Sequence, residues 1–256
     1  MRKAIIGGTG VYDAFEQAQT QSILTAYGEV TYDLIQTDGF EIVFLARHGK
    51  QHDVPPHKIN YHANMMALKM LEVDEIYAIC AVGSMNDAFD PGTVVLITDF
   101  MDFTKNRSQT FFDGGDSQVA HVEMTDPYCK TLRNRFLETV PEFAIDYKGN
   151  AVYVCTEGPR FETAAEIKMY RQLGGDVVGM TNIPESVLAK ELGLCYSAVG
   201  VITNWCTGIE GKAIEGHQID ASMQKNKAQL TQLFIKSFKS SKSERTCHCE
   251  SALIIL

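Results

Sequence analysis

Short runs of apolar residues alternate along this chain with stretches whose apolar positions recur at helical spacing. This alternation is typical of an α/β sheet with helices on its faces. The apolar runs predict strands at 4–6, 31–35, 41–46, 75–81, 93–98, 152–155, 176–178 and 195–201. The helical spacing predicts helices at 60–71, 126–137, 162–173, 184–192 and 218–238. We therefore expect a single α/β domain with a mixed central β-sheet flanked by helices.

The sequence shows neither an internal repeat nor a domain linker, so residues 1–240 are expected to form one domain and residues 241–256 a flexible tail. This tail contains Cys247-His248-Cys249, a pattern that could bind a metal ion or be redox active. Two thiols and one imidazole fall short of a closed tetrahedral site within one chain. The expectation is therefore an unstructured tail without a metal.

Composition and charge narrow the class of partner. The chain is 45% hydrophobic and 21% charged, as is usual for a soluble globular protein. With a net charge of -9, the chain lacks the excess of positive charge that neutralises the phosphates of a nucleic acid. No apolar run is long enough to span a membrane, and the seven cysteines include no CxxC pair. These features indicate a cytoplasmic protein that binds neither nucleic acid nor membrane.

The segment 153–163 predicts a place for a flat heterocycle. An apolar strand meets the turn Gly158-Pro159, and a helix follows at once, so Phe161 and Glu162 arrive at one spot. An aromatic ring can stack on a heterocycle, and a carboxylate can accept its N–H protons. The alternative is a helix start at which the glutamate complements the helix dipole.

Three further segments carry groups suited to an anion. Glycines around Thr9 let backbone amides approach an anion, Arg47-His48-Gly49 offers a guanidinium fork, and the Thr181 hydroxyl precedes a helix. A tight turn and an ordinary helix cap are the alternatives at Thr9 and Thr181. The glycine spacing does not fit a dinucleotide fold. Arg-His-Gly also occurs in phosphohistidine phosphatases, although there it follows the first strand.

Asn204 ends the strand that begins at Cys195. In α/β sheets ligands usually bind at the carboxyl ends of strands. Because a carboxamide both donates and accepts, Asn204 could read a ring carbonyl and a neighbouring N–H together. A turn asparagine is the alternative.

Taken in order, these segments resemble the purine nucleoside phosphorylase superfamily, trimeric branch, and most closely its methylthioadenosine phosphorylase subfamily. The resemblance covers roughly residues 3–238, and the matching stretches are 5–10, 46–49, 56–61, 81–84, 91–92, 110–114, 157–162 and 179–181. It implies a nucleoside phosphorylase-like fold and phosphate-dependent cleavage of the N-glycosidic bond of a purine nucleoside. The products would be a free purine and a (5-methylthio)ribose 1-phosphate. Inorganic phosphate is then a co-substrate, and neither a cofactor nor a metal is expected.

The resemblance also assigns roles to residues. Phosphate would be held by Thr9, Arg47, His48, the amide of Ala81, and Thr181. Met180 would pack against the ribose and Phe161 against the base. His121 matches a residue that family members lend to a neighbouring subunit, which implies a homotrimer. Cys80 departs from the pattern, because relatives often place a hydroxyl or amide there.

The base is indicated by two positions. Members that cleave 6-aminopurines share Asp-Tyr-Asp at the position of Asn204-Trp205-Cys206 and tend to have Ser at Glu162, whereas Glu and Asn together resemble the 6-oxopurine phosphorylases. Glu162 would accept from N1–H of the base, and Asn204 would donate to O6 or N7. With adenine, the carboxylate would face the unprotonated N1, so that two hydrogen-bond acceptors oppose each other. This costs about 1 kcal/mol or more. The expected substrate is a 6-oxopurine nucleoside such as methylthioinosine, inosine or guanosine, with S-methyl-5'-thioadenosine as the alternative.

The sequence allows two interpretations of the pocket for the 5′ substituent. Ile214 and Ile219 suggest an apolar slot for a methylthio group, while His217 lies near the position where inosine-cleaving relatives place a histidine for the 5′-hydroxyl. Two hypotheses from other classes remain. A histidine phosphatase would use His48 as its nucleophile, and a non-catalytic nucleoside-binding module would bind purine nucleosides without phosphate-dependent release of base.

Overall fold

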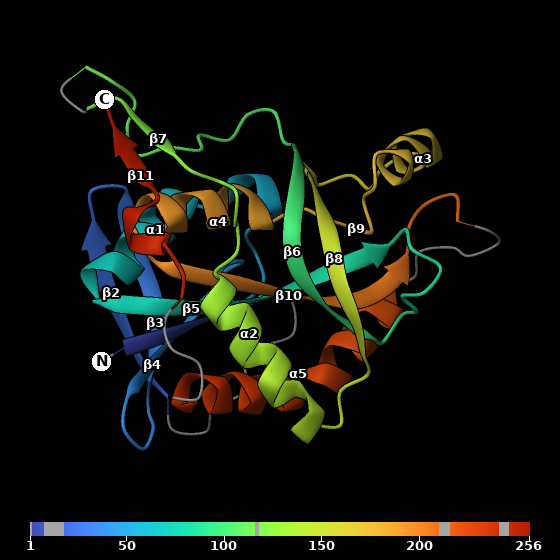
Figure 1. Ribbon diagram of the computed structural model, residues 1–256, viewed down its shortest axis with the longest axis horizontal. Helices are drawn as coiled ribbons and strands as arrows, with labels where there is room; N and C mark the ends of the chain where they lie inside the picture. The colour runs from blue at the N-terminus through green and yellow to red at the C-terminus, as the bar shows by residue number, and fades with distance from the viewer. Residues whose placement is uncertain (1, 8–17, 116–117, 210–215, 241–245) are drawn as a thin grey trace.

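The computed structural model describes residues 2–7, 18–115, 118–209, 216–240 and 246–256. The strands of its main sheet are β1 (Arg2–Gly7), β2 (Gln19–Thr25), β3 (Gly28–Gln36), β4 (Glu41–Ala46), β5 (Val73–Ser84), β6 (Val94–Phe103), β8 (Tyr147–Thr156), β9 (Val177–Gly179) and β10 (Cys195–Trp205). Within the described residues they form one sheet in the order β10-β6-β8-β9-β5-β1-β4-β3-β2 (Figure 1). Both parallel and antiparallel pairs occur in it, so the expected mixed sheet is confirmed.

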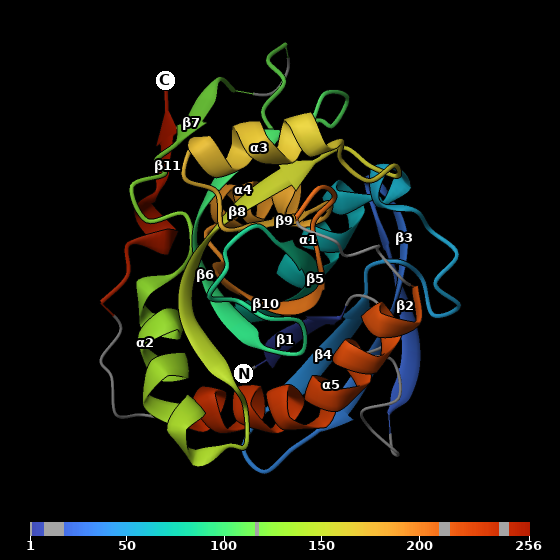
Figure 2. The same ribbon diagram turned by 90° about the vertical axis from the view of Figure 1, so that its right-hand side faces the viewer.

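One extra pairing shapes the sheet. β10 pairs with β5 as well as with β6, so β5, β9, β8, β6 and β10 close on themselves, and β1, β4, β3 and β2 extend from this barrel (Figure 2). Nearly every residue of β5 is buried, because side chains cover both of its faces. A strand buried on both sides is expected to be apolar throughout rather than alternating, as Ile76–Val82 is here.

Helices cover both faces of the sheet. They are α1 (Tyr61–Met70), α2 (Lys130–Thr139), α3 (Ala164–Gln172), α4 (Asn182–Glu191) and α5 (Gly216–Lys239), with short 3-10 turns η1 (Pro56–Lys58), η2 (Val140–Glu142) and η3 (Cys249–Ser251). α1 and α4 pack in one apolar cluster with the sheet, and α2 and α5 in a second one. In the second cluster the ring of Phe234 stacks on Tyr77 with centroids 4.5 Å apart. No helix of the described residues is both long and apolar enough to cross a membrane.

The predicted strands and helices are all present, with changed bounds. One shift concerns α2, which begins at Lys130 instead of residue 126. Cys129 has a non-helical backbone, and its N–H donates to the carbonyl of Tyr196 at 2.7 Å. The preceding residues are therefore tied to β10, and the helix starts only after them.

The carboxyl-terminal segment was not anticipated. β7 (Ala120–Val122) and β11 (Leu253–Ile255) form a separate antiparallel pair, in which Ile254 lies opposite His121. Residues 246–256 thus fold against the domain, unlike the flexible tail expected from the sequence, while residues 241–245 lie outside the described residues. The polar run before Cys247 suggested a tail, but Cys249 and Ala252 are buried.

Candidate active site

A cavity of about 430 Å³ lies at the carboxyl ends of β4, β5 and β10. Pockets of this size suit a small organic ligand. Most of the residues predicted to bind substrate line it, from segments far apart in the sequence: Arg47, His48, Ala81, Phe161, Glu162, Met180, Thr181, Asn204 and Ile219. The sequence motifs therefore converge on one site.

Two glycines make room for this lining. Gly158 has φ +66°, and a Cβ there would lie 2.6 Å from Sδ of Met180. A Cβ on Gly83 would lie 2.9 Å from Sγ of Cys206 and 3.2 Å from Nδ2 of Asn204. The positive φ of Gly158 favours glycine, and at both positions a Cβ would press on neighbouring side chains of the cavity wall.

Arg47 is held by a buried ion pair. Its Nε and Nη2 donate to the two carboxylate oxygens of Glu185, each at 2.8 Å, and Nη1 donates to the carbonyl of Ile79 at 2.7 Å. Both side chains are fully buried. Burial alone lowers the pKa of Arg47, but the carboxylate of Glu185 outweighs it and raises that pKa well above its usual value. The guanidinium is a fixed positive charge with two further N–H groups.

His48 is neutral in this site. Its Nδ1 lies 2.9 Å from the carbonyl of Val54, so Nδ1 carries the proton and Nε2 is the acceptor. Burial and the charge of Arg47 lower the pKa of His48 to about 4. At neutral pH the ring therefore presents an unprotonated Nε2 beside the arginine.

Thr181 stands at the start of α4 without capping it. Its side chain makes no capping hydrogen bond, and its backbone N–H donates to the hydroxyl of Tyr153 at 3.2 Å. The alternative of an ordinary N-cap is therefore not what the structure shows. The next residue, Asn182, donates to Sγ of Cys80 at 3.2 Å, which places this helix start against β5 beside Ala81.

Glu162 is buried and oriented by a neighbour. Its residue exposure is 7%, and its Oε1 accepts a 2.6 Å hydrogen bond from the hydroxyl of Thr156 at the end of β8. This bond fixes the plane of the carboxylate. An ionised carboxylate can only accept, so Glu162 calls for a donor on the ligand.

The polarity of Asn204 is fixed in the same way. Its Nδ2 donates to the carbonyl of Trp205 at 2.9 Å, and its Oδ1 accepts from the hydroxyl of Thr203 at 2.8 Å. Only the NH₂ group can face the Trp205 carbonyl, so the amide cannot be flipped without opposing two oxygens. The register of β10 against β5 shifts between Ile202 and Asn204, and such irregularities re-aim side chains next to active sites. One N–H of Nδ2 remains for a ligand.

The two groups of residues lie along β5. Ile79 and Cys80 contact Arg47 and Asn182, whereas Gly83 lies against Asn204. Three to four residues of a strand span about 10–13 Å. This distance separates two parts of the cavity. One part contains Arg47 and suits an anion, and the other contains Glu162 and Asn204, which can form hydrogen bonds with a polar ring.

Sequence reasoning missed two parts of the site. His52–Pro56 line the cavity directly after the Arg47-His48-Gly49 turn, and their proximity to that motif was the available signal. Arg107 donates to the carbonyls of Glu157, Met180 and Ile183 at 2.7, 2.7 and 2.6 Å. It joins the segment before Glu162 to the segment before α4, and no local pattern marks it.

Four predicted residues are not part of this cavity as described. Thr9 and Ile214 lie outside the described residues, as does the side chain of His217. His121 is exposed on β7, and this strand lies at the upper left of Figure 1, whereas β5 and β10 point to the right. His121 does not line the cavity of its own chain.

Comparison with known proteins agrees with this geometry. A family model described as the phosphorylase superfamily matches residues 2–239. The chain is 45% identical over 258 residues to the 6-oxopurine nucleoside phosphorylase of Pyrococcus furiosus, covering 98% of this chain and 97% of that protein. It is 41% identical over 251 residues to the S-methyl-5'-thioadenosine phosphorylase of Pyrococcus abyssi, covering 97% and 96%. A methylthioadenosine phosphorylase from an antarctic soil metagenomic library has a similar solved structure, with TM-score 0.88, 33% identity and coverage of 99% and 91%.

Proposed function

The chain belongs to the phosphorylase superfamily, and we propose that it uses inorganic phosphate to cleave the N-glycosidic bond of 6-oxopurine nucleosides. The observation that carries this proposal is the pair Glu162 and Asn204 in one cavity, with polarities fixed by Thr156, Thr203 and Trp205. Hypoxanthine and guanine present N1–H to the carboxylate and O6 to the amide N–H. Adenine presents an acceptor and a donor at those places, so both contacts are mismatched.

The reaction needs no covalent nucleophile from the protein. A phosphate oxygen forms a bond to C1′ of the ribose while the bond from C1′ to N9 breaks and its electron pair goes to the purine. The sugar passes through oxocarbenium character, as in glycoside cleavage. The N–H of Asn204 stabilises the negative charge that spreads to O6 and N7 of the leaving base. Phosphate alignment and charge stabilisation are thus the tasks of the site.

Phosphate is held by groups of two kinds. The remaining N–H groups of Arg47, the hydroxyl of Thr181 and the amide of Ala81 donate to its oxygens. The unprotonated Nε2 of His48 accepts the O–H of monohydrogen phosphate. Met180 then packs against the ribose, and Phe161, half exposed at the mouth of the cavity, against the base. The buried Arg47–Glu185 pair keeps the cation in place before phosphate arrives.

The assembly proposed here is a homotrimer. His121 is exposed on β7, outside its own cavity, and its family counterpart serves a neighbouring subunit. A second chain placed so that β7 reaches its cavity completes that site.

Release of free purine from inosine and methylthioinosine, measured with and without phosphate, tests the proposal. We expect release only with phosphate and formation of a sugar 1-phosphate. Equal release without phosphate refutes phosphorolysis. Binding without release in either condition supports the non-catalytic module, and trapping of phosphohistidine at His48 supports the phosphatase.

Methylthioadenosine phosphorolysis is the second candidate. The 41% identical Pyrococcus abyssi relative bears that name, and Ile219 offers an apolar contact in the cavity wall. A higher kcat/KM for methylthioadenosine than for methylthioinosine favours this candidate and leaves the phosphorolysis mechanism intact.

A further inference from the structure

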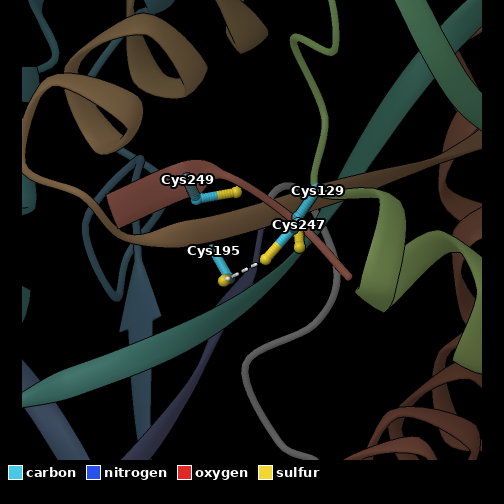
Figure 3. A group of neighbouring side chains, drawn as sticks. All are labelled: Cys129, Cys195, Cys247 and Cys249. Atoms are coloured by element: carbon cyan, nitrogen blue, oxygen red, sulfur yellow. Dashed lines mark hydrogen bonds between the residues drawn. The ribbon is translucent and has the colours of Figure 1, made fainter. Parts of the chain in front are cut away.

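A second cluster of reactive side chains lies away from the cavity. Cys129 precedes α2, Cys195 begins β10, and Cys247 and Cys249 belong to the carboxyl-terminal segment. Their sulfur atoms all lie within 4.8 Å of one another. Figure 3 shows the four side chains gathered where β10, the start of α2 and the end of the chain meet. The two thiols of the terminal pair thus gain two partners from the domain, which the spacing of cysteines along the sequence does not reveal.

Contacts other than the thiols hold the segments of this cluster in place. The N–H of Cys129 donates to the carbonyl of Tyr196, next to Cys195. On the terminal segment, the N–H of Thr246 donates to Oγ1 of Thr131 on α2 at 3.0 Å. The carbonyl of Ala252 accepts from the N–H of Glu123 at 2.9 Å, just before β11 pairs with β7. The cluster is therefore a built site at which four thiols are brought together by the fold.

The sulfur positions suit a common central ion. Sγ of Cys195 and Sγ of Cys247 are 3.5 Å apart. Four sulfurs placed about 2.3 Å from a zinc ion in a tetrahedron are about 3.8 Å from one another. All four sulfurs lie within 4.8 Å of one another, which is close to the spacing that one shared tetrahedral ion requires. Cys129, Cys195 and Cys249 are buried, so the centre is shielded from water on most sides.

We propose that Cys129, Cys195, Cys247 and Cys249 bind one zinc ion as a structural tetrathiolate site. On binding, each thiol releases its proton to solvent and forms one Zn–S bond, so the closed site has no open position for catalysis. The four thiolates and the ion carry a net charge of about -2 by the ordinary charges of these groups. The small cavity next to the cluster is lined by two lysines and by two carboxylates, namely Lys130, Lys190, Glu123 and Asp126.

The ion links the chain end to the sheet. It joins the segment 246–256 to the starts of α2 and β10, and β11 in turn lies beside β7, which carries His121. Metal binding itself does not depend on the proposed enzymatic function. The only consequence that rests on that function is the steadier placement of His121 for a neighbouring subunit.

The test measures metal in the full-length protein purified under reducing conditions. We expect one zinc per chain by inductively coupled plasma mass spectrometry. Replacement by Co(II) is expected to give the strong visible absorption of tetrahedral thiolate-bound cobalt. Cys247→Ser and Cys249→Ser are expected to lose at least tenfold in zinc affinity, by competition with a chromophoric chelator. His248→Ala, between the two ligands, and Cys155→Ser, a buried cysteine outside the cluster, serve as matched controls and retain the metal.

Two results overturn the proposal. One is a protein without metal in which the four cysteines form two disulfides, seen by mass spectrometry and by the absence of reactive thiols before reduction. The other is a reduced protein whose four thiols react freely and retain neither Zn(II) nor Co(II) when these are supplied. Neither readout uses catalysis, so failure of this proposal and failure of the proposed function are distinguished.

Discussion

In the proposed complex, the two side chains Glu162 and Asn204 select the base. Both residues could be identified from the sequence. Glu162 follows the turn Gly158-Pro159, and Asn204 lies at the end of a predicted strand. The hydrogen bonds from Thr156 and Thr203 that fix their polarity were not identifiable, since these partners became neighbours only through packing. The sequence thus predicts which groups contact the base in the proposed complex, and the fold determines how those groups are oriented.

Asn204→Asp tests this assignment. An acceptor replaces the N–H that faces the 6-position, so we expect kcat/KM for inosine to fall about 10²–10³-fold and the preference to move toward adenosine. Steady-state kinetics on both nucleosides checks this, with the KM for phosphate as the internal control. An unchanged ratio of the two kcat/KM values contradicts the contact between Asn204 and the base.

His48 links stability to pH. Its pKa in the folded chain is about 4, below the usual 6.5 of an unfolded chain, so the unfolded state binds more protons between these values. The contribution is fully present above about pH 6.5 and is lost as pH falls toward 4. From pH 7 to pH 5 it lowers the free energy of unfolding by about 2 kcal/mol.

Denaturant titrations at pH 7 and pH 5 without phosphate check this value. His48→Asn keeps a donor for the Val54 carbonyl but has no titrating ring, so its stability is expected to fall less over the same interval. Equal pH dependence in both proteins would mean that His48 is already charged in the folded chain.

At the scale of elements, most strands and helices could be predicted because their apolar periodicity is strong. The sequence did not predict the strands β2, β7 and β11. β2 is largely exposed and polar, and β7 and β11 are three residues each and form only by pairing with one another across the chain. The closure of β10 onto β5 is likewise a long-range pairing without a local signal.

The Arg47–Glu185 pair joins the end of β4 to α4, so its removal is expected to affect stability as well as phosphate binding. Arg47→Ala leaves a buried carboxylate unpaired and is expected to cost about 3–5 kcal/mol. Adding Glu185→Gln removes that charge and keeps an acceptor for the Tyr196 hydroxyl. The double variant is therefore expected to be more stable than Arg47→Ala alone in urea denaturation. Additive losses would show that the two residues do not stabilise the fold as a pair.

For the whole molecule, the exposed position of His121 predicts that the active unit is an oligomer. Light scattering is expected to give a trimer. His121→Ala is expected to lower kcat/KM about tenfold or more without changing the unfolding midpoint, since the loss of one positioning contact costs about 1.4 kcal/mol or more. A fully active monomer contradicts the shared site.

The central claim is that this site breaks the glycosidic bond of 6-oxopurine nucleosides with phosphate. Methylthioinosine and methylthioadenosine differ in the base at its 6-position and in the protonation of N1, which are the atoms that face Glu162 and Asn204 in the proposed complex. The most direct measurement is therefore kcat/KM for both nucleosides at saturating phosphate. A kcat/KM for methylthioinosine at least tenfold higher, corresponding to about 1.4 kcal/mol, is the predicted result. A clear preference for methylthioadenosine would contradict it.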